Sequence, residues 1–209
     1  LVGSEMCIRD RGATKEELLK VAESLPYSLT ADEVPEISGV GNYALTVRSS
    51  DGKKDACVLY CIDSNTYSTI KGVKGYDYIK RDQIDWYCKK SAEFTRNNGG
   101  EPVPSLAFFH IALPEFNQAA SDENAQLYGI RREKACAPAL NSGLFTAIKE
   151  NGDVMGVFVG HDHDDDYAVC WYDVLLAYGR FTGGPTEYIH IPNLSLIHIS
   201  EPTRQAEIS

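Results

Sequence analysis

The sequence lacks any apolar run of the roughly 18–20 residues that a membrane-spanning helix needs, so we expect no membrane span. Positive charge is also scarce, because 20 Lys and Arg stand against 30 Asp and Glu and the formal net charge is −10. That balance argues against a groove for nucleic-acid phosphates. The six cysteines include no CxxC pair, which excludes a zinc ribbon or a dithiol redox motif. The remaining composition, 43% hydrophobic and 24% charged, is typical of a single globular domain.

The two ends of the chain are related to each other through their coding DNA. Residues 1–11 read LVGSEMCIRDR and residues 194–204 read LSLIHISEPTR, and opposite strands of one DNA word can encode both. The word resembles a transposase-type sequencing-library adapter read in an open frame. We therefore expect 1–11 and 194–209 to be adapter-derived, and 12–193 to be the C-terminal part of a single domain. The alternative is a genuine terminal strand at 194–200.

Local patterns in the first half of the chain predict two helices and a hairpin. Thr14 and Glu17 form a capping box, and Asn98-Gly99-Gly100 closes a second amphipathic helix. Ser50-Asp51-Gly52 separates two β-prone runs and indicates a tight turn. The expected elements are helices at 15–24 and 80–97 and strands at 42–48 and 56–62.

The second half alternates short apolar strands with one predicted helix. The runs 105–111 and 153–159 are nearly continuous in apolar residues, as strands buried on both faces are. The further expected elements are a long loop at 115–140, a helix at 141–150, strands at 167–171 and 174–178, and a glycine-rich turn at 179–184. Helices that alternate with buried strands predict a layered α/β domain, and the sequence shows no internal repeat or interdomain linker.

The strongest chemical motif is Gly160-His161-Asp162-His163, which directly follows a buried strand. In an extended segment, residues i and i+2 point the same way about 6.6 Å apart, so two imidazoles can address one metal or two neighbouring metals. We expect Gly160 to permit a sharp turn there. The acidic run 164–166 offers candidate acceptors for imidazole N–H groups. The alternative is a solvated loop in which these acids only maintain solubility.

A second histidine strengthens the metal interpretation. His110 ends another buried strand, and the carboxyl ends of strands in open α/β sheets are where functional sites assemble. A single histidine at a strand end is more often a core residue, but three such histidines together favour a metal site. His190 lies in a Tyr-Ile-His-Ile-Pro stretch, and we interpret it as structural or exposed.

These motifs resemble those of the calcineurin-like metallophosphoesterases, in particular the branch of small purple-acid-phosphatase-like proteins. The GHxH block with an upstream strand-end histidine is the specific part of this resemblance. The matching blocks are 39–43 (GVGNY), 59–68 (LYCIDSNTYS), 75–86 (GYDYIKRDQIDW), 108–116 (FFHIALPEF), 141–145 (NSGLF) and 159–166 (VGHDHDDD). The resemblance implies an α-β-β-α sandwich of two mixed sheets, truncated at its N-terminus.

The resemblance also implies a ligand set for a dinuclear metal site of the Fe, Zn or Mn class. His110 and His161 would share one metal, and His163 would bind its neighbour. The D-x-H, GD and GNH blocks that complete the family's site, including the catalytic histidine, are absent, since Gly41-Asn42 is followed by Tyr43. The implied parent would hydrolyse small phosphate mono- or diesters and would be exported or periplasmic. The chain alone is expected to be inactive.

Two other functions remain open on the sequence alone. One is a non-catalytic α/β binding module derived from the same family, and the other is a mononuclear zinc hydrolase of a different family. Segments 115–140 and 179–184 are the candidates for shaping substrate access, although both could equally be ordinary surface loops. The sequence indicates no oligomeric state.

Overall fold

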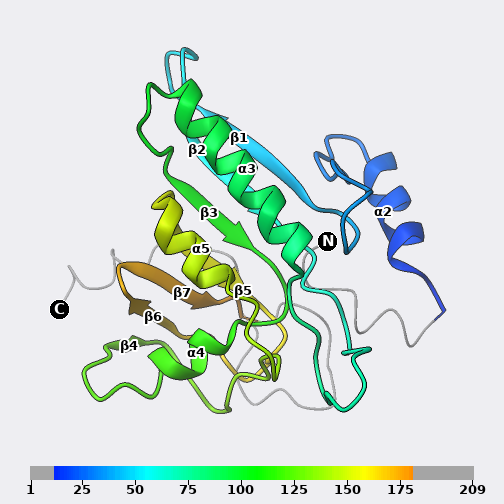
Figure 1. Cartoon of the computed structure of the whole chain (residues 1–209), viewed down its shortest axis with the longest axis vertical. Helices are drawn as coiled ribbons and strands as arrows, with labels where there is room; N and C mark the ends of the chain where they lie inside the picture. The colour runs from blue at the N-terminus through cyan, green and yellow to red at the C-terminus, as the bar shows by residue number, and fades with distance from the viewer. Residues whose placement is uncertain (1–11, 181–209) are drawn as a thin grey trace.

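The computed structural model describes residues 12–180 (Figure 1). The predicted adapter-derived ends, His190 and most of the predicted turn at 179–184 lie outside the described residues. Across 12–180, no helix is both long enough and apolar enough to cross a membrane.

The seven strands of the described region form one mixed sheet, in the order β1-β2-β3-β5-β7-β6-β4. Neighbouring pairs from β2 to β7 through β3 and β5 are parallel, whereas β1, β6 and β4 each pair antiparallel with their neighbours. The bounds are β1 Tyr43–Arg48, β2 Asp55–Cys61, β3 Ser105–Phe108, β4 Leu127–Tyr128, β5 Val154–Val159, β6 Ala168–Trp171 and β7 Val174–Tyr178. The predicted mixed α/β class is confirmed. Within 12–180 a single sheet is present where the family resemblance implied two.

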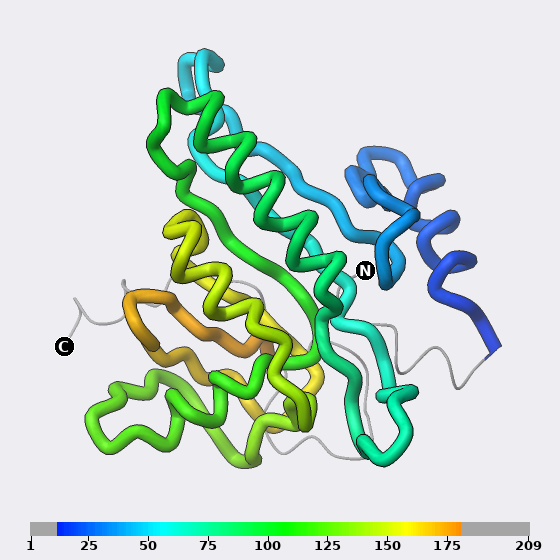
Figure 2. Tube along the Cα trace, in the orientation of Figure 1, coloured from blue at the N-terminus to red at the C-terminus, as the bar shows by residue number. Residues whose placement is uncertain are grey.

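In the described part of the chain, four helices accompany this sheet: α2 Lys15–Ser24, α3 Arg81–Asn97, α4 Pro114–Ala119 and α5 Leu144–Asn151. Helices α3 and α5 lie side by side across one face, α3 along β2 and β3 and α5 near β5 and β7 (Figures 1 and 2). Helix α2 stands beside the sheet rather than on that face (Figure 2). The predicted helix at 15–24 is confirmed, and both halves of the capping box at Thr14 form.

The segment predicted as a loop at 115–140 is partly ordered into elements, and that prediction was incomplete. Pro114 begins α4, where the fixed φ of proline and its missing N–H suit a first helical position. Phe116 is fully buried, and its ring meets that of Tyr178 edge to face. Burial of one apolar residue against β7 therefore stabilises a helix that is too short to show a periodic pattern.

A buried carboxylate fixes α3 to the centre of the sheet. Asp153, just before β5, is 3% exposed and accepts hydrogen bonds from Tyr87 of α3 (2.5 Å) and Tyr60 of β2 (3.3 Å). Burial and this carboxylate raise the pKa of both tyrosines far above the ordinary range, so they remain donors. At the opposite end of these strands, the parallel pairing of β2, β3 and β5 brings their carboxyl ends to one edge of the sheet, where the loops that carry the candidate site begin.

Candidate metal centre

The loops after β2, β3 and β5 are held together by hydrogen bonds at the strand ends. The Ile111 amide donates to Ser64 Oγ (2.9 Å), which connects the loop after β3 to the loop after β2. The Gly160 amide donates to the His110 carbonyl (3.0 Å), which connects the loops after β3 and β5. This arrangement places His110 and His161 on adjacent loops of the same sheet edge.

His110 and His161 face each other across that edge. His161 Nδ1 lies 3.1 Å from His110 Nε2, and the two rings are nearly perpendicular with centroids 5.0 Å apart. The His110 side chain is buried, and its other nitrogen, Nδ1, has no hydrogen-bond partner among residues 12–180. A buried imidazole nitrogen without a partner is costly in a structural site and is common where a function requires it.

The backbone of His161 adopts a left-handed conformation, with φ of 74°. We expected Gly160 to provide the sharp turn, but it is His161, a residue with a Cβ, that does so. Left-handed backbone at a non-glycine residue costs on the order of 1–3 kcal/mol and persists where the surroundings impose it. The site therefore stores local strain at the residue that is a predicted ligand.

The three histidines interact electrostatically and are held in the neutral form. Burial, followed by the charges of His161, His163 and Lys15, lowers the pKa of His110 to about 3. Burial also lowers the pKa of His161 and of His163, and the charge of His163 adds to the effect on His161. Neutral imidazole is the form that binds metals, so the electrostatics favour coordination near neutral pH.

The acidic residues of 162–166 are not solvated, and two of them do not act as predicted. Asp165 is fully buried and accepts from the amides of Arg132 (2.9 Å) and Glu133 (3.2 Å). Asp166 accepts from the Ile130 amide (2.6 Å) and pairs with Arg180. These two carboxylates do not orient imidazoles as predicted. They accept hydrogen bonds from backbone amides of 130–133 and so attach that segment to the histidine loop.

Cys136 is a possible ligand that the sequence analysis missed. One ligand atom each from Cys136, His161 and Asp162 lie within 4.8 Å of one another. Partial burial, and then the neighbouring carboxylates Asp162, Glu133 and Asp165, raise the pKa of the Cys136 thiol to about 12. Cys136 stands 24 positions before the GHxH block, so no local spacing could have revealed the contact.

The donor set fits a transition-metal ion. Two imidazole nitrogens bound to one tetrahedral ion at about 2.0–2.1 Å lie roughly 3.4 Å apart. The separation of 3.1 Å between the nitrogens of His110 and His161 is close to this value. Imidazole suits the Zn, Fe and Mn class, and the residues do not discriminate among these metals.

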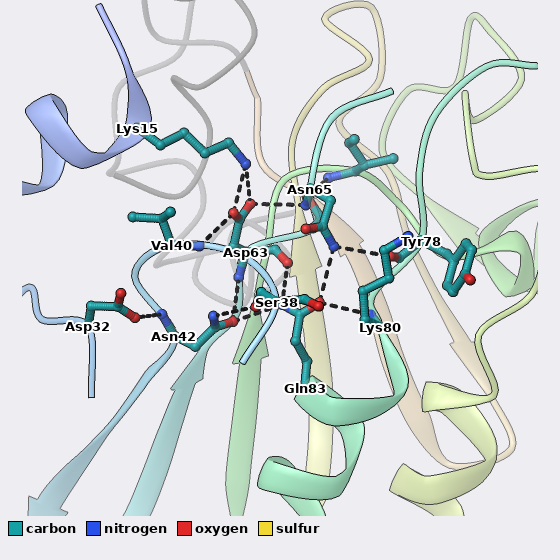
Figure 3. Close-up of polar contacts among 12 residues, drawn as sticks. Lys15, Asp32, Ser38, Val40, Asn42, Asp63, Asn65, Tyr78, Lys80 and Gln83 are labelled. Carbon is teal, nitrogen blue, oxygen red and sulfur yellow. Dashed lines mark hydrogen bonds and ion pairs between the residues drawn. The ribbon is translucent and has the colours of Figure 1, made fainter. Parts of the chain in front are cut away.

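A second polar cluster, centred on Asp63, lies at the end of β2 (Figure 3). The Asp63 carboxylate accepts from Lys15 Nζ (2.6 and 2.7 Å) and from the amides of Val40 (2.9 Å) and Asn65 (2.9 Å). At Gly39, φ is +84° and an added Cβ would lie 2.9 Å from the Asp63 Cβ, so only glycine fits without rearrangement. The GVGNY block thus has a structural reason for its first glycine.

The same cluster continues through buried amides. Gln83 donates from Nε2 to Asn42 Oδ1 (2.9 Å) and to the Asp63 carbonyl (2.7 Å), and the Asp63 amide donates to Asn42 Oδ1 (3.1 Å). Asn42 and Gln83 are both fully buried. This network joins the start of α3 to the loops before β1 and after β2.

A cleft of about 680 Å³ opens beside the Asp63 cluster, and its lining includes Lys15, Asn65 and Tyr67. The Tyr67 ring stacks on Tyr76 at 5.3 Å, and the Tyr76 ring meets His161 edge to face at 4.4 Å. The lining of this cleft comes from 12–18, 39–40 and 63–77, and includes no residue of 115–140, our predicted access segment.

Comparisons with known proteins give a consistent result. No model of a known protein family matches the chain. It is 36% identical over 180 residues to the probable inactive purple acid phosphatase 29 of Arabidopsis thaliana, which covers 79% of this chain and 46% of that protein. The probable inactive purple acid phosphatase 14 of the same plant is 33% identical, over 81% of this chain and 46% of its own length. Phosphatase DCR2 of Saccharomyces cerevisiae is 37% identical, over 77% of this chain and 29% of its own length. The chain thus spans less than half the length of these relatives.

Proposed function

Because the chain is homologous to purple acid phosphatase-like proteins of the calcineurin-like phosphoesterase family, we propose that it carries part of a metal-dependent phosphoric ester hydrolase. In this proposal His110, His161 and His163 are metal ligands. We further propose that they belong to a site for two metal ions. The observation that carries it is the close approach of the His110 and His161 nitrogens at the ends of two adjacent parallel strands.

The described residues have definable roles in such a reaction. Two bound metal ions would supply a hydroxide from water near neutral pH and offset the charge of the phosphoryl group. The histidines hold their lone pairs free of protons, since burial lowers the pKa of each imidazole. The cleft beside the Asp63 cluster is lined by Tyr67, whose ring stacks on Tyr76, and Tyr76 in turn contacts His161, so an aromatic wall leads from the cleft to the histidines.

The D-x-H and GNH blocks that complete this site in the resembled family are not in the sequence, and the carboxylate of its one Gly-Asp pair, Gly152-Asp153, is bound by Tyr60 and Tyr87 instead. Three imidazoles without a bridging carboxylate hold a metal pair poorly, so we propose that the chain alone has essentially no turnover. A second candidate function is a non-catalytic module of the same family. It is favoured by the word "inactive" in the names of two of the relatives.

Hydrolysis of p-nitrophenyl phosphate by a longer protein that includes the three upstream blocks tests the proposal. We expect a chelator to abolish hydrolysis, and His161→Ala to lower kcat/KM more than about 100-fold, since outer-sphere partners alone are worth 10–100-fold. Asp51→Ala, in an exposed turn remote from the site, is the matched control and should retain full activity. Unchanged hydrolysis after chelation, or in the histidine variant, would contradict the metal assignment. Metal binding without hydrolysis would favour the non-catalytic module.

A further inference from the structure

Cys136 and the histidine loop belong to segments distant in sequence that meet beside the metal centre. The Cys136 amide donates to both carboxylate oxygens of Asp162, each at 3.2 Å. This double contact fixes the backbone of Cys136, and its sulfur falls within 4.8 Å of ligand atoms of both His161 and Asp162. Ligand atoms around one tetrahedral zinc ion lie roughly 3.3–3.8 Å apart, so small side-chain rotations bring all three onto one ion.

The charge around this group favours a cation. Asp162 is 2% exposed, and its hydrogen-bond donors within 12–180 are neutral, namely the Cys136 amide and the Tyr178 hydroxyl at 2.6 Å. Asp165 is fully buried, and its Oδ2 has no hydrogen-bond partner in the described part of the chain. A buried carboxylate that accepts only from neutral donors is costly, and a bound divalent ion would offset the charge of Asp162, whereas Arg131 already offsets part of the charge of Asp165.

We propose that Cys136 is a metal ligand, and that its thiolate binds a divalent ion of the zinc and cobalt class together with His161 and Asp162. On binding, the thiol proton passes to solvent as the sulfur–metal bond forms. A thiolate ligand shifts the preference of the site from iron or manganese towards zinc. The inference rests on the proposed function only in that His161 is a ligand in both.

Thiolate ligation also has a consequence for hydrolysis. A catalytic metal keeps one coordination position open for water, whereas structural sites are closed by four protein ligands. The thiolate of Cys136 occupies one coordination position on an ion that His161 and Asp162 also bind. Cys136 therefore competes with the hydrolytic water for that position.

Cobalt(II) titration of the 209-residue chain, freed of metal, tests the assignment by spectroscopy. We expect a thiolate-to-cobalt charge-transfer band in the near ultraviolet that Cys136→Ser abolishes. The matched control is Cys170→Ser, because Cys170 is likewise a free, exposed cysteine, but on β6. That variant should keep the band. Competition with zinc should show affinity at least about tenfold weaker for Cys136→Ser than for Cys170→Ser.

Absence of the band in the unmodified chain, or its persistence in Cys136→Ser, would overturn the inference. Circular dichroism of each variant ensures that a lost band does not reflect unfolding, and Cys136→Ala provides a second exposed-site variant with the same expected loss. The outcomes are separable from those of the proposed function. Metal-dependent hydrolysis in the longer protein without a thiolate band would leave the phosphoesterase proposal intact and overturn this inference. A thiolate band without metal-dependent hydrolysis in the longer protein would support this inference and overturn the phosphoesterase proposal.

Discussion

Two polar clusters lie at the same edge of the sheet, yet they are built in opposite ways. In the Asp63 cluster the buried carboxylate meets an ammonium group from Lys15 and two backbone amides, so charge and hydrogen bonds are both satisfied. In the histidine cluster, by contrast, His110 Nδ1 and Asp165 Oδ2 are buried without a partner among residues 12–180. The backbone of His161 is also strained.

This difference separates a structural network from a binding site. A fully satisfied polar network rigidifies the loops it joins, and the Asp63 cluster connects α2, the loop before β1 and α3 in this way (Figure 3). In the histidine cluster, the free energy of the folded chain is raised by buried imidazoles, by carboxylate oxygens without a hydrogen-bond partner and by strained backbone. A bound cation would lower it. The features that destabilise the folded, metal-free chain are thus concentrated where we propose that the metal binds.

Breaking the satisfied cluster should give the largest effect on stability. Asp63→Ala leaves the Lys15 ammonium without its partner and two amides without an acceptor. The side chain of Asp63 is 1% exposed, and removal of one partner from a buried pair costs about 3–5 kcal/mol. Urea denaturation measures the change in the free energy of unfolding. Asp51→Ala, at a fully exposed carboxylate, should change it little, and equal losses in the two variants would contradict this assignment.

Acid should selectively weaken the histidine cluster. The pKa of His110 is about 3 in the folded chain, against 6.5 for an ordinary histidine. Between these two pH values the unfolded chain therefore binds a proton at His110 that the folded chain does not bind. The stability contributed by neutral His110 is therefore present above pH 6.5 and is lost as the pH falls towards 3. Between pH 6.5 and about 4.5 the metal-free chain should lose about 2 kcal/mol.

Substitution of the histidine itself provides the check on that acid sensitivity. The free energy of unfolding, measured at several pH values, should depend less steeply on pH for His110→Gln, because glutamine has no imidazole to protonate. His163→Gln should flatten them less, because that imidazole is less buried and burial is the first cause of both shifts. An acid profile that is identical in the unmodified chain and in His110→Gln would contradict the interpretation.

Relief of backbone strain should have the smallest effect, and one of opposite sign. Asparagine tolerates left-handed backbone better than histidine, so His161→Asn should stabilise the metal-free chain by about 1 kcal/mol while weakening cobalt binding. His163→Asn serves as the control, since His163 is not among the non-glycine residues with positive φ. Stabilisation by both substitutions would show that strain at His161 is not the cause.

Local signals predicted the elements well, whereas contacts between distant segments escaped the sequence. The capping box at Thr14 and the hairpin turn before β2 are encoded within a few residues, and both form as predicted. Helix α4 depends on burial of Phe116 against β7, and Cys136 depends on hydrogen bonds to a loop 26 residues away. Periodicity and motif spacing carry no information on such contacts, so they could not be predicted.

The His110–His161 pair joins positions 51 residues apart in sequence, on loops that follow two paired strands. Closing so long a loop for one contact is unfavourable until β3 and β5 have aligned. The imidazole nitrogens can consequently reach a metal-binding distance only late in folding, after the central strands are assembled. Metal affinity measured during refolding would thus report when the centre of the sheet is complete, and short peptides that contain either histidine block alone should not reproduce it.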